Sequence, residues 1–188
     1  MNTQELMKSA RSARTALASA STETKNHALN CMADALEKNT APILAANAED
    51  MESQRGIISD VMLDRLALSE DRIRGMADGI RQVAALPDPV GKVLSEHERP
   101  NGIKITKVLV PMGVIAIIYE SRPNVTSDAA ALAIKAGSAC VLRCGKEAHR
   151  SATEIVKALK AGLAEAGLPE NSIELIEDTT RQSAAEIM

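Results

Sequence analysis

The feature that most constrains the fold is a regular alternation of strand and helix patterns after Val110. The apolar run Val114–Tyr119 is typical of a strand that is buried on both faces. Two shorter strand patterns follow it, Ala139–Arg143 and Ile173–Ile176, and amphipathic helix patterns separate the three. The succession βαβαβα predicts an α/β fold with a parallel sheet that is covered on both faces by helices.

The helices of this region have recognisable ends. Gly137 predicts the end of a helix over Ala129–Ala136, since glycine is the usual residue just beyond a helix terminus. Ser151–Glu154 has the spacing of a capping box and predicts the start of the next helix. A last helix pattern begins near Thr180 and reaches Met188 without a cap. We therefore expect the chain to be the front part of a longer protein, with its sheet incomplete.

Residues 1–90 predict helices alone. Ser69 is a suitable N-cap for one of them, and Pro87-Asp88-Pro89 ends the helical region. Residues 91–110 predict a hairpin around Asn101-Gly102, a type I′ turn signal, although Pro100 leaves a longer loop as the alternative. The exposed edge of such a hairpin is available to another subunit. We expect three parts: helices over 1–90, a hairpin over 91–110 that joins subunits, and a cofactor-binding core over 111–188.

Composition excludes several functional classes. The 188 residues are 45% hydrophobic and 25% charged, which suffices for one ordinary core. A net charge of -3 and a single aromatic residue argue against nucleic-acid binding. Three cysteines and three histidines lack disulfide or metal-ligand spacing, so no metal is expected. No signal peptide or membrane span is recognisable, and we expect a cytoplasmic protein.

Ligands of parallel sheets bind at the carboxyl ends of the strands, which here are Glu120–Asn124 and Cys144–Glu147. Seven basic residues and only two acidic ones lie between Arg99 and Lys146, so this region can attract anions such as phosphates. The alternative, a merely solvated face, stays open for Arg122, Arg143 and Lys146. The sequence thus points to an anionic nucleotide at this edge.

The common nucleotide motifs are absent. No Gly-x-Gly-x-x-Gly follows a predicted strand, and Gly145-Lys146 lacks the earlier glycine and the following Ser or Thr of a phosphate loop. Cys144 lies beside two cations that would favour a thiolate, but no partner base is in sight and we expect a small filling residue. We likewise expect His149 to be a loop residue rather than a catalytic base.

Residues Val110–Thr126, with the sequence VPMGVIAIIYESRPNVT, resemble the signature stretch of the gamma-glutamyl phosphate reductase family. Leu142–Ala148 (LRCGKEA), Met62–Leu66 (MLDRL) and Asp88–Gly91 (DPVG) are also similar to that family. Cys144 departs from it, since a second glycine is usual there. The family, also called glutamate-5-semialdehyde dehydrogenase, is part of the aldehyde dehydrogenase superfamily and has a Rossmann-like cofactor domain, a catalytic domain and an oligomerising hairpin.

The resemblance implies NADPH-dependent reduction of L-glutamate 5-phosphate to L-glutamate 5-semialdehyde and phosphate, a step of proline synthesis. It also implies that the nucleophilic cysteine lies beyond Met188, so that the chain alone is inactive. A homo-oligomer is implied for the whole enzyme, and glutamate 5-kinase, which makes the acyl phosphate, is a candidate partner. Neither nucleic acid nor membrane is expected to bind.

Site residues follow from the same resemblance. Asn124 matches the asparagine that donates to the oxyanion in the superfamily; the alternative is that it caps the following helix. Arg143 matches a lysine on the adenosine ribose, and Lys146 stands where NAD-specific relatives often have an acid, which favours NADPH. The remaining cofactor-binding candidates are Ser121, Arg122, Pro123 and Gly145.

Other functional classes stay open on the sequence. One is a nucleotide-binding or interaction module without catalysis. Another is an acyl-phosphate or aldehyde dehydrogenase with a different substrate, which the Arg122-Pro123-Asn124 stretch disfavours.

Overall fold

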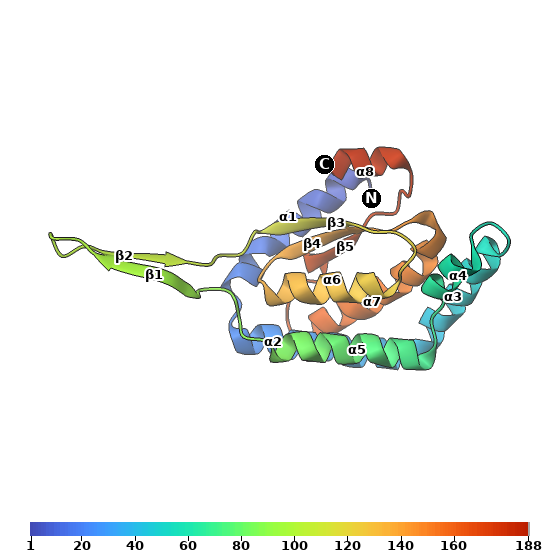
Figure 1. Cartoon of the computed structure of the whole chain (residues 1–188), viewed down its shortest axis with the longest axis horizontal. Helices are drawn as coiled ribbons and strands as arrows, with labels where there is room; N and C mark the ends of the chain where they lie inside the picture. The colour runs from blue at the N-terminus through green and yellow to red at the C-terminus, as the bar shows by residue number, and fades with distance from the viewer. Residues whose placement is uncertain (188) are drawn as a thin grey trace.

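The computed structural model describes residues 1–187 and places helices, a projecting hairpin and a parallel sheet in that order along the chain (Figure 1). The helices before the hairpin are α1 (Thr3–Ser19), α2 (Thr22–Lys38), α3 (Thr40–Gln54), α4 (Asp60–Leu66) and α5 (Glu70–Ala85). The hairpin consists of β1 (Val93–Glu98) and β2 (Lys104–Val108). The rest is β3 (Val114–Ile118), α6 (Asn124–Lys135), β4 (Ala139–Arg143), α7 (His149–Glu165), β5 (Ile173–Leu175) and α8 (Arg181–Ile187), with 3₁₀ turns at Lys146–Ala148 and Glu170–Ser172.

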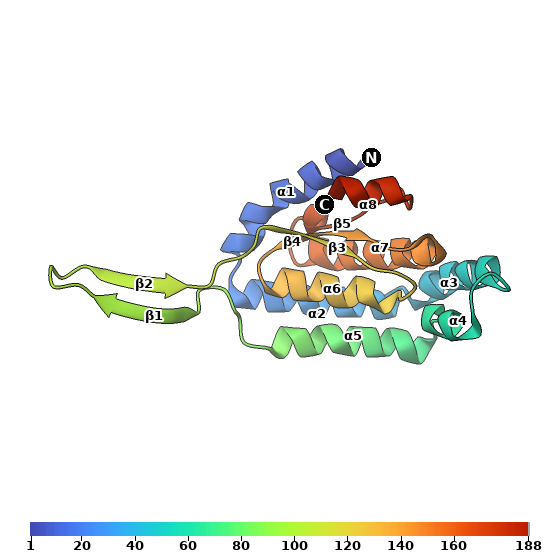
Figure 2. The same cartoon turned by 45° about the horizontal axis from the view of Figure 1, so that its top comes forward.

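The predicted βαβαβα succession is confirmed. The sheet has the order β3-β4-β5, and both pairs are parallel. Helices α6 and α7 cross from one strand to the next on one face, α2 and α5 pack behind them, and α1 lies on the other face (Figure 2). The core therefore lies between the sheet and two layers of helices, around fully buried side chains such as Leu29, Met32 and Leu142.

The prediction that Val114–Tyr119 is buried on both faces is wrong. Within residues 1–187, β3 is the edge strand of the sheet with no strand paired to its outer side, and Ile118 is 44% exposed. The central strand β4 is the buried one, with Ala139–Leu142 at most 1% exposed. An apolar run cannot distinguish an edge strand from a central one, since that depends on what pairs beside it.

The hairpin has the longer loop and not a two-residue turn. The Arg99 N–H donates to the Ile103 carbonyl at 2.9 Å, and the Gly102 N–H donates to the Arg99 carbonyl at 2.8 Å. Gly102 has a φ of 84°, whereas Asn101 does not share that left-handed conformation. A type I′ turn requires positive φ at both central residues, so the Asn-Gly signal serves a wider connection here.

Two predicted helix boundaries are confirmed. Ser69 accepts a hydrogen bond from the Arg72 N–H at the start of α5. Gly137, with a φ of 68°, follows the end of α6, as glycine does at a left-handed terminus.

The prediction that a capping box at Ser151 starts the helix is wrong, because α7 begins two residues earlier, at His149. The Ser151 N–H and hydroxyl donate to Asp50 Oδ2 at 2.8 and 2.7 Å, and Asp50 comes from α3. The N-terminus of α7 is thus capped by a residue a hundred positions away. His149 is accordingly helical and not part of a loop.

Within the described residues, each helix is either too short or too polar to span a bilayer.

Candidate functional site

The loops that follow β3 and β4 meet at the carboxyl edge of the sheet, as predicted. The Ser121 hydroxyl donates to Glu147 Oε1 at 2.9 Å, which ties one loop to the other. The Glu147 carboxylate lies directly over Gly145, and a Cβ at residue 145 would overlap it. A side chain at residue 145 would therefore displace the Glu147 carboxylate from its present position. Ser121, Pro123 and Gly145 are all buried in this region.

The two cations of the β4 loop have different environments. Arg143 Nη2 donates to the carbonyls of Thr179 and Thr180 at 2.6 and 2.9 Å, so this nitrogen holds the loop after β5. Its Nε is buried without a hydrogen-bond partner. Lys146 is exposed and has no ion pair among the described residues. Lys146 is therefore the cation that is available to a ligand, while Arg143 has one nitrogen engaged and one donor unused.

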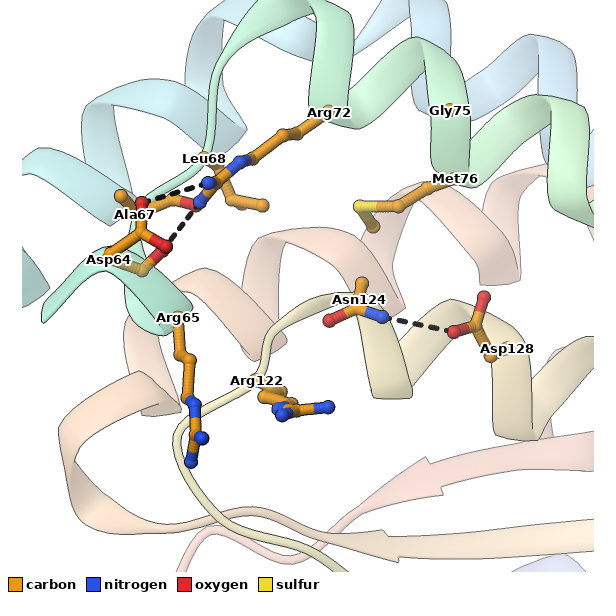
Figure 3. Close-up of a pocket in the computed structure, with 10 residues that line it drawn as sticks. All are labelled: Asp64, Arg65, Ala67, Leu68, Arg72, Gly75, Met76, Arg122, Asn124 and Asp128. Atoms are coloured by element: carbon orange, nitrogen blue, oxygen red, sulfur yellow. Dashed lines mark hydrogen bonds and ion pairs between the residues drawn. The ribbon is translucent and has the colours of Figure 1, made fainter. Parts of the chain in front are cut away.

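The alternative that Asn124 caps α6 is wrong. The residue is the first of the helix, Pro123 occupies the N-cap position, and no side chain caps this terminus. Instead, Asn124 Nδ2 donates to Asp128 Oδ2 at 3.1 Å, one turn further along α6 (Figure 3). The amide therefore belongs to the wall of a pocket.

That pocket has a volume of about 390 Å³ and lies between the α4–α5 region and the first turns of α6 (Figure 3). Arg122 projects into it below Asn124, and its side chain forms no hydrogen bond or ion pair with the β4 loop within residues 1–187. The predicted site residues thus divide into two groups. Arg143, Gly145 and Lys146 belong to the strand edge, and Asn124 lines the pocket; Arg122 lines this pocket and also a neighbouring one that it shares with Ser121.

Sequence reasoning missed the opposite wall of the pocket. Its charged members are Asp64, Arg65 and Arg72, which come from α4 and α5. Arg72 is held in place, since its Nη2 donates to Asp64 Oδ1 at 2.9 Å and its Nη1 to the Ala67 carbonyl at 2.7 Å. Asp128 was also missed, although its spacing of four residues from Asn124 places both on one helix face.

Burial determines the ionisation of the remaining candidates. It raises the pKa of the Cys144 thiol to about 12, more than nearby Arg143 can lower it, and the residue is 1% exposed, as expected of a small filling residue. Burial also raises the pKa of the Tyr119 hydroxyl, which bonds to Thr126 at 2.7 Å. The pKa of Asp128 is raised because its half-buried carboxyl is desolvated, and the hydrogen bond from Asn124 opposes that shift.

Metal chemistry has no obvious location in residues 1–187, where the acidic, histidine and cysteine side chains form no cluster suited to hold an ion.

Comparison with known proteins agrees with this geometry. Gamma-glutamyl phosphate reductase of Neisseria meningitidis serogroup C is 57% identical over 187 residues, which are 100% of this chain and 44% of that protein. The reductase of Streptococcus suis is 56% identical over 186 residues, 99% of this chain and 45% of that protein. The chain thus spans less than half the length of these curated relatives.

Solved structures give the same result. The crystal structure of gamma-glutamyl phosphate reductase from Thermotoga maritima has a TM-score of 0.97 and 40% identity, covering 100% of this chain and 45% of that one. The aldehyde dehydrogenase family model matches residues 1–188. The chain therefore belongs to the aldehyde dehydrogenase family.

Proposed function

We propose that this chain is the cofactor-binding part of an enzyme that reduces L-glutamate 5-phosphate to L-glutamate 5-semialdehyde and phosphate, in proline biosynthesis. Its identity of 57% over 187 residues to a curated gamma-glutamyl phosphate reductase supports this assignment. The observation that carries the mechanism is the placement of Asn124, whose amide lines a pocket and does not cap its helix.

In this reaction a cysteine thiolate attacks the acyl carbon, phosphate leaves, and a thioester remains. Cys31, Cys140 and Cys144 are all buried, so we assign the nucleophile to a segment outside these 188 residues. Asn124 Nδ2 is the donor for the oxyanion that forms during the attack. Such a donor contributes about 3 kcal/mol to the transition state. Residues 1–188 alone are then expected to be inactive.

The strand edge fits a nicotinamide dinucleotide, the cofactor class of this family. When bound, NADPH would supply the hydride that reduces the thioester. The buried, partnerless Nε of Arg143 is a donor in need of an acceptor, and exposed Lys146 offers a positive charge beside it. Beside them, the Glu147 carboxylate lies over Gly145 and accepts a hydrogen bond from the Ser121 hydroxyl. We propose that Lys146 contacts the 2′-phosphate and makes NADPH preferred over NADH.

The resemblance to gamma-glutamyl phosphate reductases also leads us to propose that the whole enzyme forms a homo-oligomer through the hairpin. Glutamate 5-kinase as a partner and a location in the cytoplasm stay predictions.

A chimera tests the proposal directly, with these 188 residues joined to the remaining part of the Neisseria meningitidis relative. We expect the chimera to oxidise glutamate 5-semialdehyde in the presence of phosphate and NADP. In the same assay, Lys146→Glu should lower the NADP-to-NAD ratio of kcat/KM by about tenfold or more, whereas Lys8→Glu, an exposed charge reversal on α1, should not.

Two results would contradict parts of the proposal. An unchanged ratio in Lys146→Glu would remove Lys146 from the cofactor site. A folded chimera that binds the cofactor without turnover would favour a nucleotide-binding module without catalysis.

A further inference from the structure

The pocket beside Asn124 contains charges that the protein itself leaves uncompensated. Asp64 and Arg72 neutralise each other at 2.9 Å. Arg65 and Arg122, by contrast, form no ion pair and no side-chain hydrogen bond within residues 1–187. In the described part of the chain, the carboxylate of Asp128 bonds only to the neutral amide of Asn124. One wall therefore presents positive charge and another presents negative charge toward the same space (Figure 3).

The second carboxylate oxygen of Asp128, Oδ1, faces α5 at a position where that helix has glycines. Oδ1 lies 3.9 Å from the position that a Cβ on Gly79 of α5 would occupy. Gly75, one turn earlier on α5, also lines the pocket, and a Cβ there would meet nothing within 4 Å. The space above Asp128 is therefore open on the side of α5, where a small polar group can enter.

Half-burial without a cationic partner is costly for a carboxylate. Desolvation raises the pKa of Asp128 accordingly, and no neighbouring arginine is among the groups that lower it. A ligand that brings its own positive charge would stabilise the ionised form. A ligand carboxylate would do the same for an unpaired arginine, with two parallel hydrogen bonds.

We propose that this pocket selects the α-amino-acid end of the substrate, with Asp128 binding its α-ammonium group and Arg122 its α-carboxylate. The inference rests on the function proposed above and assigns the substrate's zwitterionic end to named side chains. Asp128 is then a specificity residue and Asn124 the catalytic one.

The dimensions of the substrate agree with this assignment. In L-glutamate 5-phosphate, four bonds separate the reacting carbonyl carbon from the amino nitrogen, about 5 Å when extended. Asn124 and Asp128 are four residues apart on α6, a rise of about 6 Å along the helix axis, and their side chains converge so that Nδ2 and Oδ2 are 3.1 Å apart. A substrate lying along the first turns of α6 can therefore place its carbonyl at Asn124 and its ammonium group at Asp128.

The test compares two aldehydes in the chimera, in the direction of oxidation with NADP and phosphate. One is L-glutamate 5-semialdehyde, and the other is 5-oxopentanoate, which has the same carbon chain without the amino group. Asp128→Asn removes the charge but keeps an oxygen acceptor for Asn124. We expect kcat/KM for the semialdehyde to fall about 30-fold and that for 5-oxopentanoate to stay within threefold. Asp71→Asn, an equal change of charge at a solvated position of α5, should leave both values unchanged.

Equal losses with both aldehydes in Asp128→Asn would overturn the proposal, because Asp128 would then act only through Asn124. No loss with either would overturn it as well. A wild-type chimera that oxidises neither aldehyde would contradict the proposed function itself, and the inference would fall with it.

A second variant tests the pocket without touching its charges. Gly75→Leu should fill the open space and lower kcat/KM for both aldehydes at least tenfold. Gln82→Leu, on an exposed position of the same helix, serves as the matched control. Unchanged kinetics in Gly75→Leu would show that the substrate does not enter this pocket.

Discussion

At the scale of single residues, the chemistry of the thiols follows from burial. Cys140 and Cys144 are at most 1% exposed, and desolvation raises the pKa of each thiol to about 12. At pH 8 the thiolate fraction is therefore far smaller than for a solvated cysteine. We expect a thiol reagent such as Ellman's reagent to modify both at least 100-fold more slowly in the folded chain than in urea. Rapid modification at the same rate in both states would contradict their buried positions.

Asp88 allows a prediction about pH. Desolvation raises its pKa, but hydrogen bonds from Lys25 Nζ, the Thr22 hydroxyl and the Val90 N–H outweigh that effect, so its pKa lies below the usual value. The Lys25–Asp88 pair, at 2.6 Å, therefore contributes stability above the pKa of the unfolded chain, about 4, and loses it as pH falls through the lower folded-state pKa.

Urea unfolding between pH 7 and pH 3 measures this contribution. We expect the free energy of unfolding to fall less steeply with acid in Asp88→Asn than in the wild type. Asp71→Asn, whose side chain is 90% exposed, should keep the wild-type slope. Identical slopes in wild type and Asp88→Asn would contradict the prediction.

The candidate site was only partly predictable at this scale. Asn124 could be singled out from the sequence because it belongs to a recognisable motif. Lys146 could be singled out because it follows the end of a predicted strand. The engagement of Arg143 with Thr179 and Thr180 was not predictable, since it depends on where the loop after β5 returns. The presence of Arg65 in the pocket was not predictable either, since it lines the same space as Arg122 and Asn124, about 60 positions later in the chain.

At the scale of elements, the start of α7 depends on Asp50. This carboxylate is 1% exposed, accepts two hydrogen bonds from Ser151 and pairs with Arg150 Nη1 at 3.3 Å. Asp50→Ala leaves a buried N–H and a buried hydroxyl without acceptors. We expect a loss of about 3 kcal/mol in the free energy of unfolding, measured in urea.

Ser151→Ala separates the two contributions. It removes the hydroxyl but keeps the N–H bond to Asp50, so a loss of about 1 kcal/mol is expected. If Asp50→Ala cost no more than Ser151→Ala, the carboxylate would not be the cap of α7.

The same element shows where sequence patterns fail. Ser69 and Gly137 act through neighbours within a few positions, and both boundaries could be predicted. Ser151 has the spacing of a capping box, yet its hydroxyl donates to Asp50 of α3 instead of accepting from its own helix. Local patterns therefore predict helix ends well only where no distant carboxylate competes for the same donors.

At the scale of the whole molecule, the hairpin is the feature that most clearly offers a surface for association with another chain. Strands β1 and β2 project away from the body, and the views in Figures 1 and 2 agree on this. Their apolar side chains are exposed, among them Val93 at 53%, Leu94 at 49% and Ile105 at 47%. A two-stranded hairpin is marginally stable alone in water, and its unpaired edges can accept a further strand.

We therefore expect the 188-residue chain to self-associate through this hairpin. The double variant Leu94→Thr with Ile105→Thr keeps β-forming residues but removes the apolar side chains, and it should shift the mass measured by light scattering toward the monomer at equal concentration. Ile57→Thr, which removes a side chain that is 72% exposed after α3, is the matched control and should keep the wild-type mass. Circular dichroism should show the same helix content in all three proteins.

A wild-type chain that stays monomeric at high concentration would contradict this role for the hairpin. Loss of association in Ile57→Thr alone would instead place the contact at the α3–α4 connection.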